Sequence, residues 1–69
     1  MDFKWEDGFT IATRLDGDSI VITANREGLL SLAENLKTLA EEEGRSHFHL
    51  DEYNSLEEGS KELIIEKAE

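Results

Sequence analysis

The strongest constraint on the fold is a turn signal, Asp16-Gly17, which lies between two segments of alternating apolar and polar residues. Glycine tolerates the positive φ angle that a type I′ turn requires, so this dipeptide is typical of a two-residue hairpin loop. We therefore predict a β-hairpin with strands at 9–15 and 18–24. With Asp16 and Gly17 as the loop, the expected pairs are Leu15 with Asp18, Thr13 with Ile20, Ile11 with Ile22 and Phe9 with Ala24.

Because successive side chains of a strand point to opposite faces, this hairpin has one apolar face and one mixed face. We expect the apolar face to lie on the hydrophobic core. Its members are Phe9, Ile11, Leu15, Ile20 and Ile22. The mixed face carries Thr10, Ala12, Arg14, Ser19, Val21 and Thr23.

One amphipathic helix is predicted over 26–43. Asn25 is a favourable N-cap, Glu27 places negative charge in the first turn, and Gly44 is a natural stop. Apolar residues recur at three- and four-residue spacing, which makes a single stripe along the helix. The stripe consists of Leu29, Leu32, Ala33, Leu36, Leu39 and Ala40.

The remainder of the chain predicts two more strands, at 46–53 and 61–67, joined by a loop at 54–60. The ββαββ order indicates an α+β fold in which one helix packs on one face of a four-stranded antiparallel sheet. The residues expected under the helix are Phe9, Ile11, Ile20, Ile22, Phe48, Leu50, Leu63 and Ile65. The opposite face, left without cover, carries Thr10, Ala12, Val21, Thr23, His47, His49, Asp51, Tyr53 and Ile64.

With 69 residues, the chain suffices for one small domain, 1–69, with a modest core. Within it, residues 1–8 are either an edge strand or an N-terminal arm. We expect Phe3 and Trp5 to cap the open end of the core; the alternative is an exposed edge that binds a partner. An enclosed active-site cavity of roughly several hundred Å³ would remove much of such a core, which argues against an enzyme.

Acidic residues dominate the charge, with 17 Asp and Glu against 7 Lys and Arg and a net charge of -10. This charge repels phosphate backbones and anionic lipid, so neither nucleic acid nor a membrane is an expected partner. It favours association with basic protein surfaces. The chain has no cysteine, no signal-peptide pattern and no apolar run near the roughly 18 residues of a membrane helix, so we expect a cytoplasmic protein.

His47, His49 and Asp51 occupy alternate positions of a predicted strand, so their side chains share one face. Two imidazoles and a carboxylate can bind zinc and leave a fourth position open for water. The competing interpretation is a solvated strand face that happens to hold two histidines, and we favour it because the chain has no other histidine or cysteine. The chain also has no glycine-rich phosphate loop and no Ser/His/Asp nucleophile pattern, so we expect neither catalysis nor a cofactor.

A cluster of acidic residues around one tyrosine is the candidate partner-binding site. Tyrosine is a favoured anchor at protein interfaces, and carboxylates attract a basic partner. Leu56, in the same segment, is either an exposed apolar anchor or packs back on the core. The predicted interface residues are Asp51, Glu52, Tyr53, Glu57 and Glu58, with His47 and His49 as supporting members.

Three segments together resemble the immunity protein 32 family of bacterial polymorphic toxin systems. They are 23–33 (TANREGLLSLA), 47–51 (HFHLD) and 63–65 (LII), and the resemblance extends from about Gly8 to Lys67. It implies a non-catalytic protein that binds and occludes a cognate toxin. Because many such toxins are nucleases with basic clefts, the implied partner is a basic protein.

Two alternatives remain beside toxin binding. One is a small homodimeric structural or regulatory domain, in which two uncovered sheet faces or two edge strands pack about a two-fold axis. The other is a zinc-binding protein that uses His47, His49 and Asp51. Light scattering tests the first alternative, and a zinc-dependent rise in melting temperature tests the second.

Overall fold

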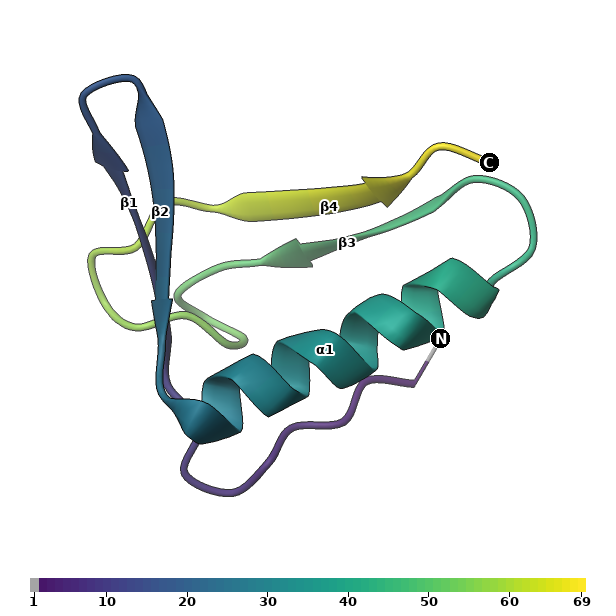
Figure 1. Ribbon diagram of the computed structural model, residues 1–69, viewed down its shortest axis with the longest axis horizontal. Coiled ribbons are helices and arrows are strands. Elements are labelled where there is room, and N and C mark those ends of the chain that lie inside the picture. The colour runs from purple at the N-terminus through teal and green to yellow at the C-terminus, as the bar shows by residue number, and fades with distance from the viewer. Residues whose placement is uncertain (1) are drawn as a thin grey trace.

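A computed structural model describes residues 2–69 of the chain. The elements are β1 (Ile11–Asp16), β2 (Ser19–Ala24), α1 (Arg26–Glu41), β3 (Ser46–Leu50) and β4 (Leu63–Lys67). The α+β class and the ββαββ order are as predicted. The single four-stranded sheet was wrong, because the strands of the described part form two separate antiparallel hairpins, β1–β2 and β3–β4. Figure 1 shows that β3 and β4 run along α1, whereas the β1–β2 hairpin stands across them and projects beyond them.

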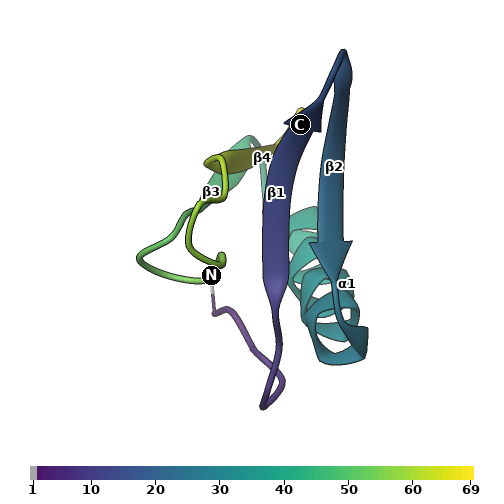
Figure 2. The same cartoon turned by 90° about the vertical axis from the view of Figure 1, so that its left-hand side faces the viewer.

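The sheet is divided because a loop segment, and not β4, occupies the outer edge of β1. The amide of Glu57 donates to the carbonyl of Ile11 at 2.8 Å, and that of Lys61 donates to the carbonyl of Thr13 at 3.4 Å. The Thr13 amide donates to Ser60 Oγ at 3.1 Å, and its hydroxyl donates to the Lys61 carbonyl. The chain then turns away from β1 before β4 begins, as Figure 2 shows from the side of the hairpin.

The predicted register of the first hairpin was wrong by two residues. Leu15 pairs with Ile20 and Asp16 with Ser19, so the loop is Gly17-Asp18. Gly17 has φ +60°, and no non-glycine residue between 2 and 69 has a positive φ. Glycine at the first of two loop positions is the type II′ arrangement, not the predicted type I′. A shift of two residues keeps every side chain on its face, so the division into an apolar and a mixed face is confirmed.

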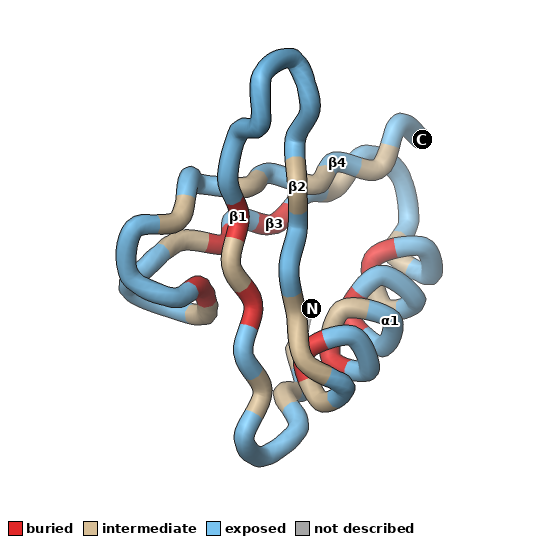
Figure 3. The backbone as a smooth tube through the Cα atoms, turned by 60° about the vertical axis from the view of Figure 1, so that its left-hand side comes forward, coloured by how far each residue is buried: buried red, intermediate tan, exposed pale blue. Residues whose placement is uncertain are grey.

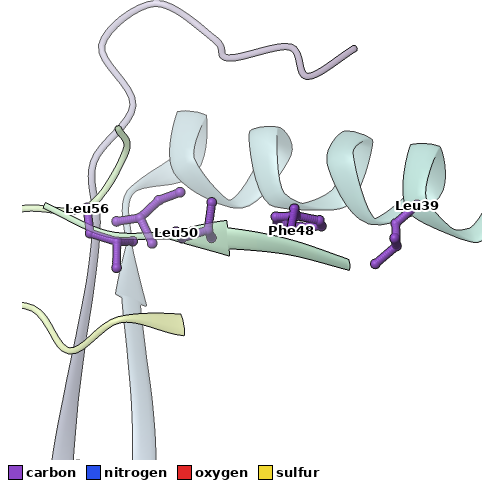
Figure 4. Close-up of a cluster of buried hydrophobic side chains, with 5 residues drawn as sticks. Leu39, Phe48, Leu50 and Leu56 are labelled. Carbon is purple, nitrogen blue, oxygen red and sulfur yellow. The ribbon is translucent and has the colours of Figure 1, made fainter. Parts of the chain in front are cut away.

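The core lies between α1, β3 and the lower part of β1. Five apolar side chains are buried there, and Figure 4 shows Leu39 and Phe48 between the helix and β3, with Leu50 and Leu56 toward β1. The five are Ile11, Leu39, Phe48, Leu50 and Leu56. Seven others pack against them and are partly buried: Phe3, Trp5, Phe9, Ala24, Leu32, Leu63 and Ile65.

The segment before β1 is an arm and not an edge strand, although residue 1 of the predicted 1–8 segment lies outside the described residues. The ring of Phe3 lies 4.8 Å from that of Phe48, and Trp5 stacks on Phe9 at 4.9 Å. Phe3 and Trp5 therefore cap the core, as expected. The arm also donates backbone hydrogen bonds to α1.

Those hydrogen bonds explain why the predicted helix stripe was only partly right: Leu39 is buried and Leu32 packs against the core, but other members of the stripe are exposed. The amide of Lys4 donates to Asn35 Oδ1 at 2.9 Å, and the amide of Glu6 donates to Ser31 Oγ at 2.8 Å. The arm covers Ser31 and Asn35, so these two polar residues are buried in addition to Gly28 and Leu39. Leu29 and Leu36 are exposed instead, and the helix ends at Glu41 rather than at residue 43.

Three of the five residues of the predicted apolar face of the hairpin are also exposed. Leu15 and Ile20 keep 61% and 71% of their surface accessible, and Ile22 keeps 44%. Figure 3 shows exposed residues along the part of the hairpin that projects from the body. The prediction that Ile20 and Ile22 lie under the helix was wrong, because the hairpin projects from the core beyond Thr13. No helix in residues 2–69 combines the length and apolarity needed to cross a membrane.

Asn25 connects the arm, the helix and β1. Its Oδ1 accepts from the amide of Gly28 at 2.7 Å and from that of Thr10 at 3.0 Å, and its Nδ2 donates to the Gly8 carbonyl at 2.9 Å. Gly28 allows this approach because a Cβ there would collide with the Thr10 carbonyl. The predicted N-cap is confirmed, and it also fixes the path of the chain into β1.

We expect Asn25→Ala to lower the free energy of unfolding by about 2 kcal/mol, because it removes the cap and leaves the Thr10 and Gly28 amides without an acceptor. Asn25→Asp keeps the acceptor and loses only the bond to Gly8, so it should lose about half as much. Urea unfolding followed by circular dichroism measures both variants. A wild-type midpoint for Asn25→Ala would contradict the role of this cap.

Candidate functional site

Residues 51–62, which connect β3 to β4, form the segment that we call the acidic loop. It holds five carboxylates and one lysine: Asp51, Glu52, Glu57, Glu58, Glu62 and Lys61. Glu52, Glu57 and Glu58 are exposed. Tyr53, which follows Glu52, keeps 96% of its surface accessible. The loop therefore presents a large aromatic side chain and several negative charges at one place.

Asp51 and Asn54 give the loop its shape. The Asp51 carbonyl accepts from the amides of Asn54, Ser55 and Leu56, and its Oδ1 accepts from the amides of Tyr53 and Asn54. Asn54 Oδ1 accepts from the Asp51 amide at 3.0 Å, and its Nδ2 donates to the His49 carbonyl at 3.0 Å. Side chains that bond nearby backbone in this way stabilise a turn. Asp51 therefore positions Tyr53, and Asn54 is a positioning residue that the sequence analysis missed.

Two further contacts hold the loop against the body. Leu56 is only 4% exposed and belongs to the core, so it is not an exposed anchor. Glu52 Oε2 accepts from the Gly59 amide at 2.7 Å, which ties the two halves of the loop together. A loop ordered by its own hydrogen bonds loses less conformational freedom when it binds a partner.

Glu52, Tyr53 and Glu58 line a surface hollow of about 350 Å³. Two carboxylates and the face of a phenol ring suit a lysine or arginine side chain, through charge-assisted hydrogen bonds and a cation–π contact. Sequence reasoning named all three of these residues. A second hollow, of about 290 Å³, lies between the arm and α1 and has mixed charge; its lining residues are Lys4, Glu6, Leu30, Ser31 and Glu34.

His47 and His49 lie on the exposed face of β3, next to the acidic loop. Their rings are 5.1 Å apart and roughly perpendicular, and His49 Nδ1 lies 3.0 Å from Glu62 Oε2. The carboxylate of Asp51 is directed into its own turn instead. Over residues 2–69, no three His, Cys, Asp or Glu side chains are arranged to hold a metal ion. The three proposed zinc ligands are thus not brought together.

The segment that forms the acidic loop also lies within a match to a protein family. A family model described as immunity protein 32 matches residues 19–68. The matched segment contains β2, α1, both strands of the second hairpin and the whole acidic loop, whereas the arm and β1 lie outside it. Neither the curated proteins nor the solved structures yielded a match.

Proposed function

We propose that this chain, which belongs to the immunity protein 32 family, is a non-catalytic protein that binds a cognate bacterial toxin and blocks it. The observation that carries the proposal is the ordered acidic loop, which lies inside the matched segment and presents Tyr53 almost fully exposed beside Glu52 and Glu58. The encounter takes place in the cytoplasm of the protected cell.

Charge supports a basic surface on the toxin as the target. The chain carries a net charge of -10, and four of the exposed residues of the loop are glutamates: Glu52, Glu57, Glu58 and Glu62. A negative surface raises the rate of encounter with a positive one and disfavours acidic partners. A toxin cleft that binds a phosphate-rich substrate carries positive charge, which complements the negative charge of the acidic loop.

The fixed conformation of the acidic loop supports tight rather than loose binding. Interfaces draw most of their binding energy from a few anchors, among which tyrosine is common. The backbone on either side of Tyr53 is fixed by Asp51 and Asn54, and Leu56 fixes the far side of the loop in the core. The toxin therefore meets an anchor whose backbone is already ordered, which reduces the entropic cost of association.

The test is co-expression of the chain with the toxin domain encoded beside its gene, in cells that the toxin alone prevents from growing. We expect growth to be restored and the two proteins to co-purify as a complex. A toxin from an unrelated system serves as the control, because binding specificity predicts that it stays lethal. Continued growth arrest with the cognate toxin, despite a folded and abundant chain, would contradict the proposal.

A further inference from the structure

The outer edge of β2 is an open strand edge with an unusual composition. Within residues 2–69, β2 pairs with β1 alone, and its six residues, SIVITA, contain no ionisable side chain. Every other described strand contains at least two. Proteins commonly protect an exposed edge with lysine, proline or a bulge. The uninterrupted register of β2 shows none of these devices.

The turn determines which backbone groups face this edge. A two-residue loop closes with a hydrogen bond from the Ser19 amide to the Asp16 carbonyl, so Ser19 directs its backbone groups toward β1. Because this direction alternates along a strand, Ile20 and Ile22 direct their N–H and C=O groups away from β1. The open edge therefore offers two donors and two acceptors on alternate residues.

The same two residues expose their side chains. Ile20 is 71% and Ile22 44% accessible, and both lie on the face that also holds Leu15. Figures 1 and 2 show that α1 begins just after the end of β2 and runs away from the hairpin. The half of the β2 edge that is nearer the turn is therefore not covered by the helix. Open backbone groups and exposed isoleucines thus coincide on one uncharged strand.

We propose that β2 pairs with β2 of a second copy, antiparallel, about a two-fold axis at Val21. In this register Ile20 lies opposite Ile22 of the second copy, Val21 opposite Val21, and Ser19 opposite Thr23. The outward backbone groups of Ile20 and Ile22 then satisfy one another, as a hydrogen-bonded pair requires. Four isoleucines gather on one face of a four-stranded sheet made by two chains.

The absence of charge on β2 allows a second copy to be the occupant, and antiparallel pairing of the strand with itself supplies partners for its open backbone groups. Two chains of charge -10 repel one another, and β2 is the strand through which they can meet without opposing like charges. The contact is smaller than a standard interface of about 1,600 Å², so the dimer is weak and depends on concentration. The acidic loop packs on the other edge of the hairpin, against Ile11 and Thr13, and stays open to a toxin.

Sedimentation velocity over a wide range of protein concentrations tests the proposal. We expect a shift from monomer to dimer that added salt strengthens, since salt screens the repulsion between the two chains. Ile20→Lys, at an exposed position, should weaken the dimer about tenfold or more by placing charge in the isoleucine cluster. Leu36→Lys makes the same change of charge at an exposed position of α1, away from β2, and should leave the dimer intact.

Circular dichroism establishes that both variants are folded. Amide exchange of the wild-type protein gives a second readout, because Ile20 and Ile22 should become protected as the concentration rises while Val21, already bonded to β1, should not change. A wild-type protein that stays monomeric would overturn the proposal. A dimer that Ile20→Lys leaves as strong as before would overturn it as well.

Discussion

Replacing Ile11 with alanine is expected to lower the free energy of unfolding by about 3 kcal/mol. Ile11 is fully buried, with 0% of its surface accessible, and it packs with Leu50 and Leu56 where β1 meets the second hairpin. Alanine would leave a cavity at the one place where the two hairpins share a core. Urea unfolding, followed through Trp5 fluorescence, should show a lower midpoint with an unchanged slope.

Leu15→Ala is the matched control for Ile11→Ala. Leu15 lies on the same face of the same strand, and the alternation of the sequence assigns it equally to the core. It is 61% exposed, so its loss should cost about 0.5 kcal/mol or less when the protein is monomeric. Equal losses for the two variants would mean that the hairpin folds back over the core, contrary to the structure.

The elements of this fold could be predicted because their signals are local. The glycine at position 17, the cap at Asn25 and the alternation of 46–50 each act within a few residues. The turn was assigned to the right place but to the wrong type, since Asp16-Gly17 and Gly17-Asp18 are both acceptable loops. Gly17 has a positive φ in both, and only the pairing of Asp16 with Ser19 separates them.

The angle between the hairpins could not be predicted, because it depends on a contact between distant segments. The amides of Glu57 and Lys61 occupy the edge of β1 that a four-stranded sheet would have given to β4. Backbone amides are present in every residue and leave no pattern in a sequence. The same is true of the arm, whose amides select Ser31 and Asn35 as the buried face of α1 in place of Leu29 and Leu36.

The clustering of acidic residues around Tyr53 predicted where the acidic loop lies. It did not distinguish the residues that shape the loop from those that face solvent. Asp51 was grouped with Glu52 and Glu58, although its carboxylate is occupied by the Tyr53 and Asn54 amides. The spacing of Asp51 and Asn54 is typical of a side-chain-capped turn and was a usable signal. Leu56 had no such signal, because its burial depends on the position of β1.

A double change in the loop, Tyr53→Ala with Glu58→Lys, is expected to weaken toxin binding by about 3 kcal/mol, or roughly 100-fold in Kd. It removes the exposed anchor and reverses one charge of the hollow. Both side chains are exposed, and neither makes one of the hydrogen bonds that hold the loop. The stability of the free protein should therefore change by less than about 0.5 kcal/mol.

Leu30→Ala with Glu34→Lys is the control for this double change. It removes one exposed apolar side chain and reverses one charge at the second hollow, between the arm and α1, so the net charge changes equally. General attraction between an acidic chain and a basic toxin would weaken both double variants alike. Recognition through the acidic loop would weaken only the first.

The most direct measurement is a calorimetric titration of the cognate toxin domain with the wild-type chain and both double variants, at one fixed salt concentration. We predict tight binding by the wild-type chain and by the Leu30→Ala, Glu34→Lys variant, and an affinity roughly 100-fold lower for the Tyr53→Ala, Glu58→Lys variant. Undiminished affinity of that folded loop variant would contradict the assignment of the acidic loop as the toxin-binding surface.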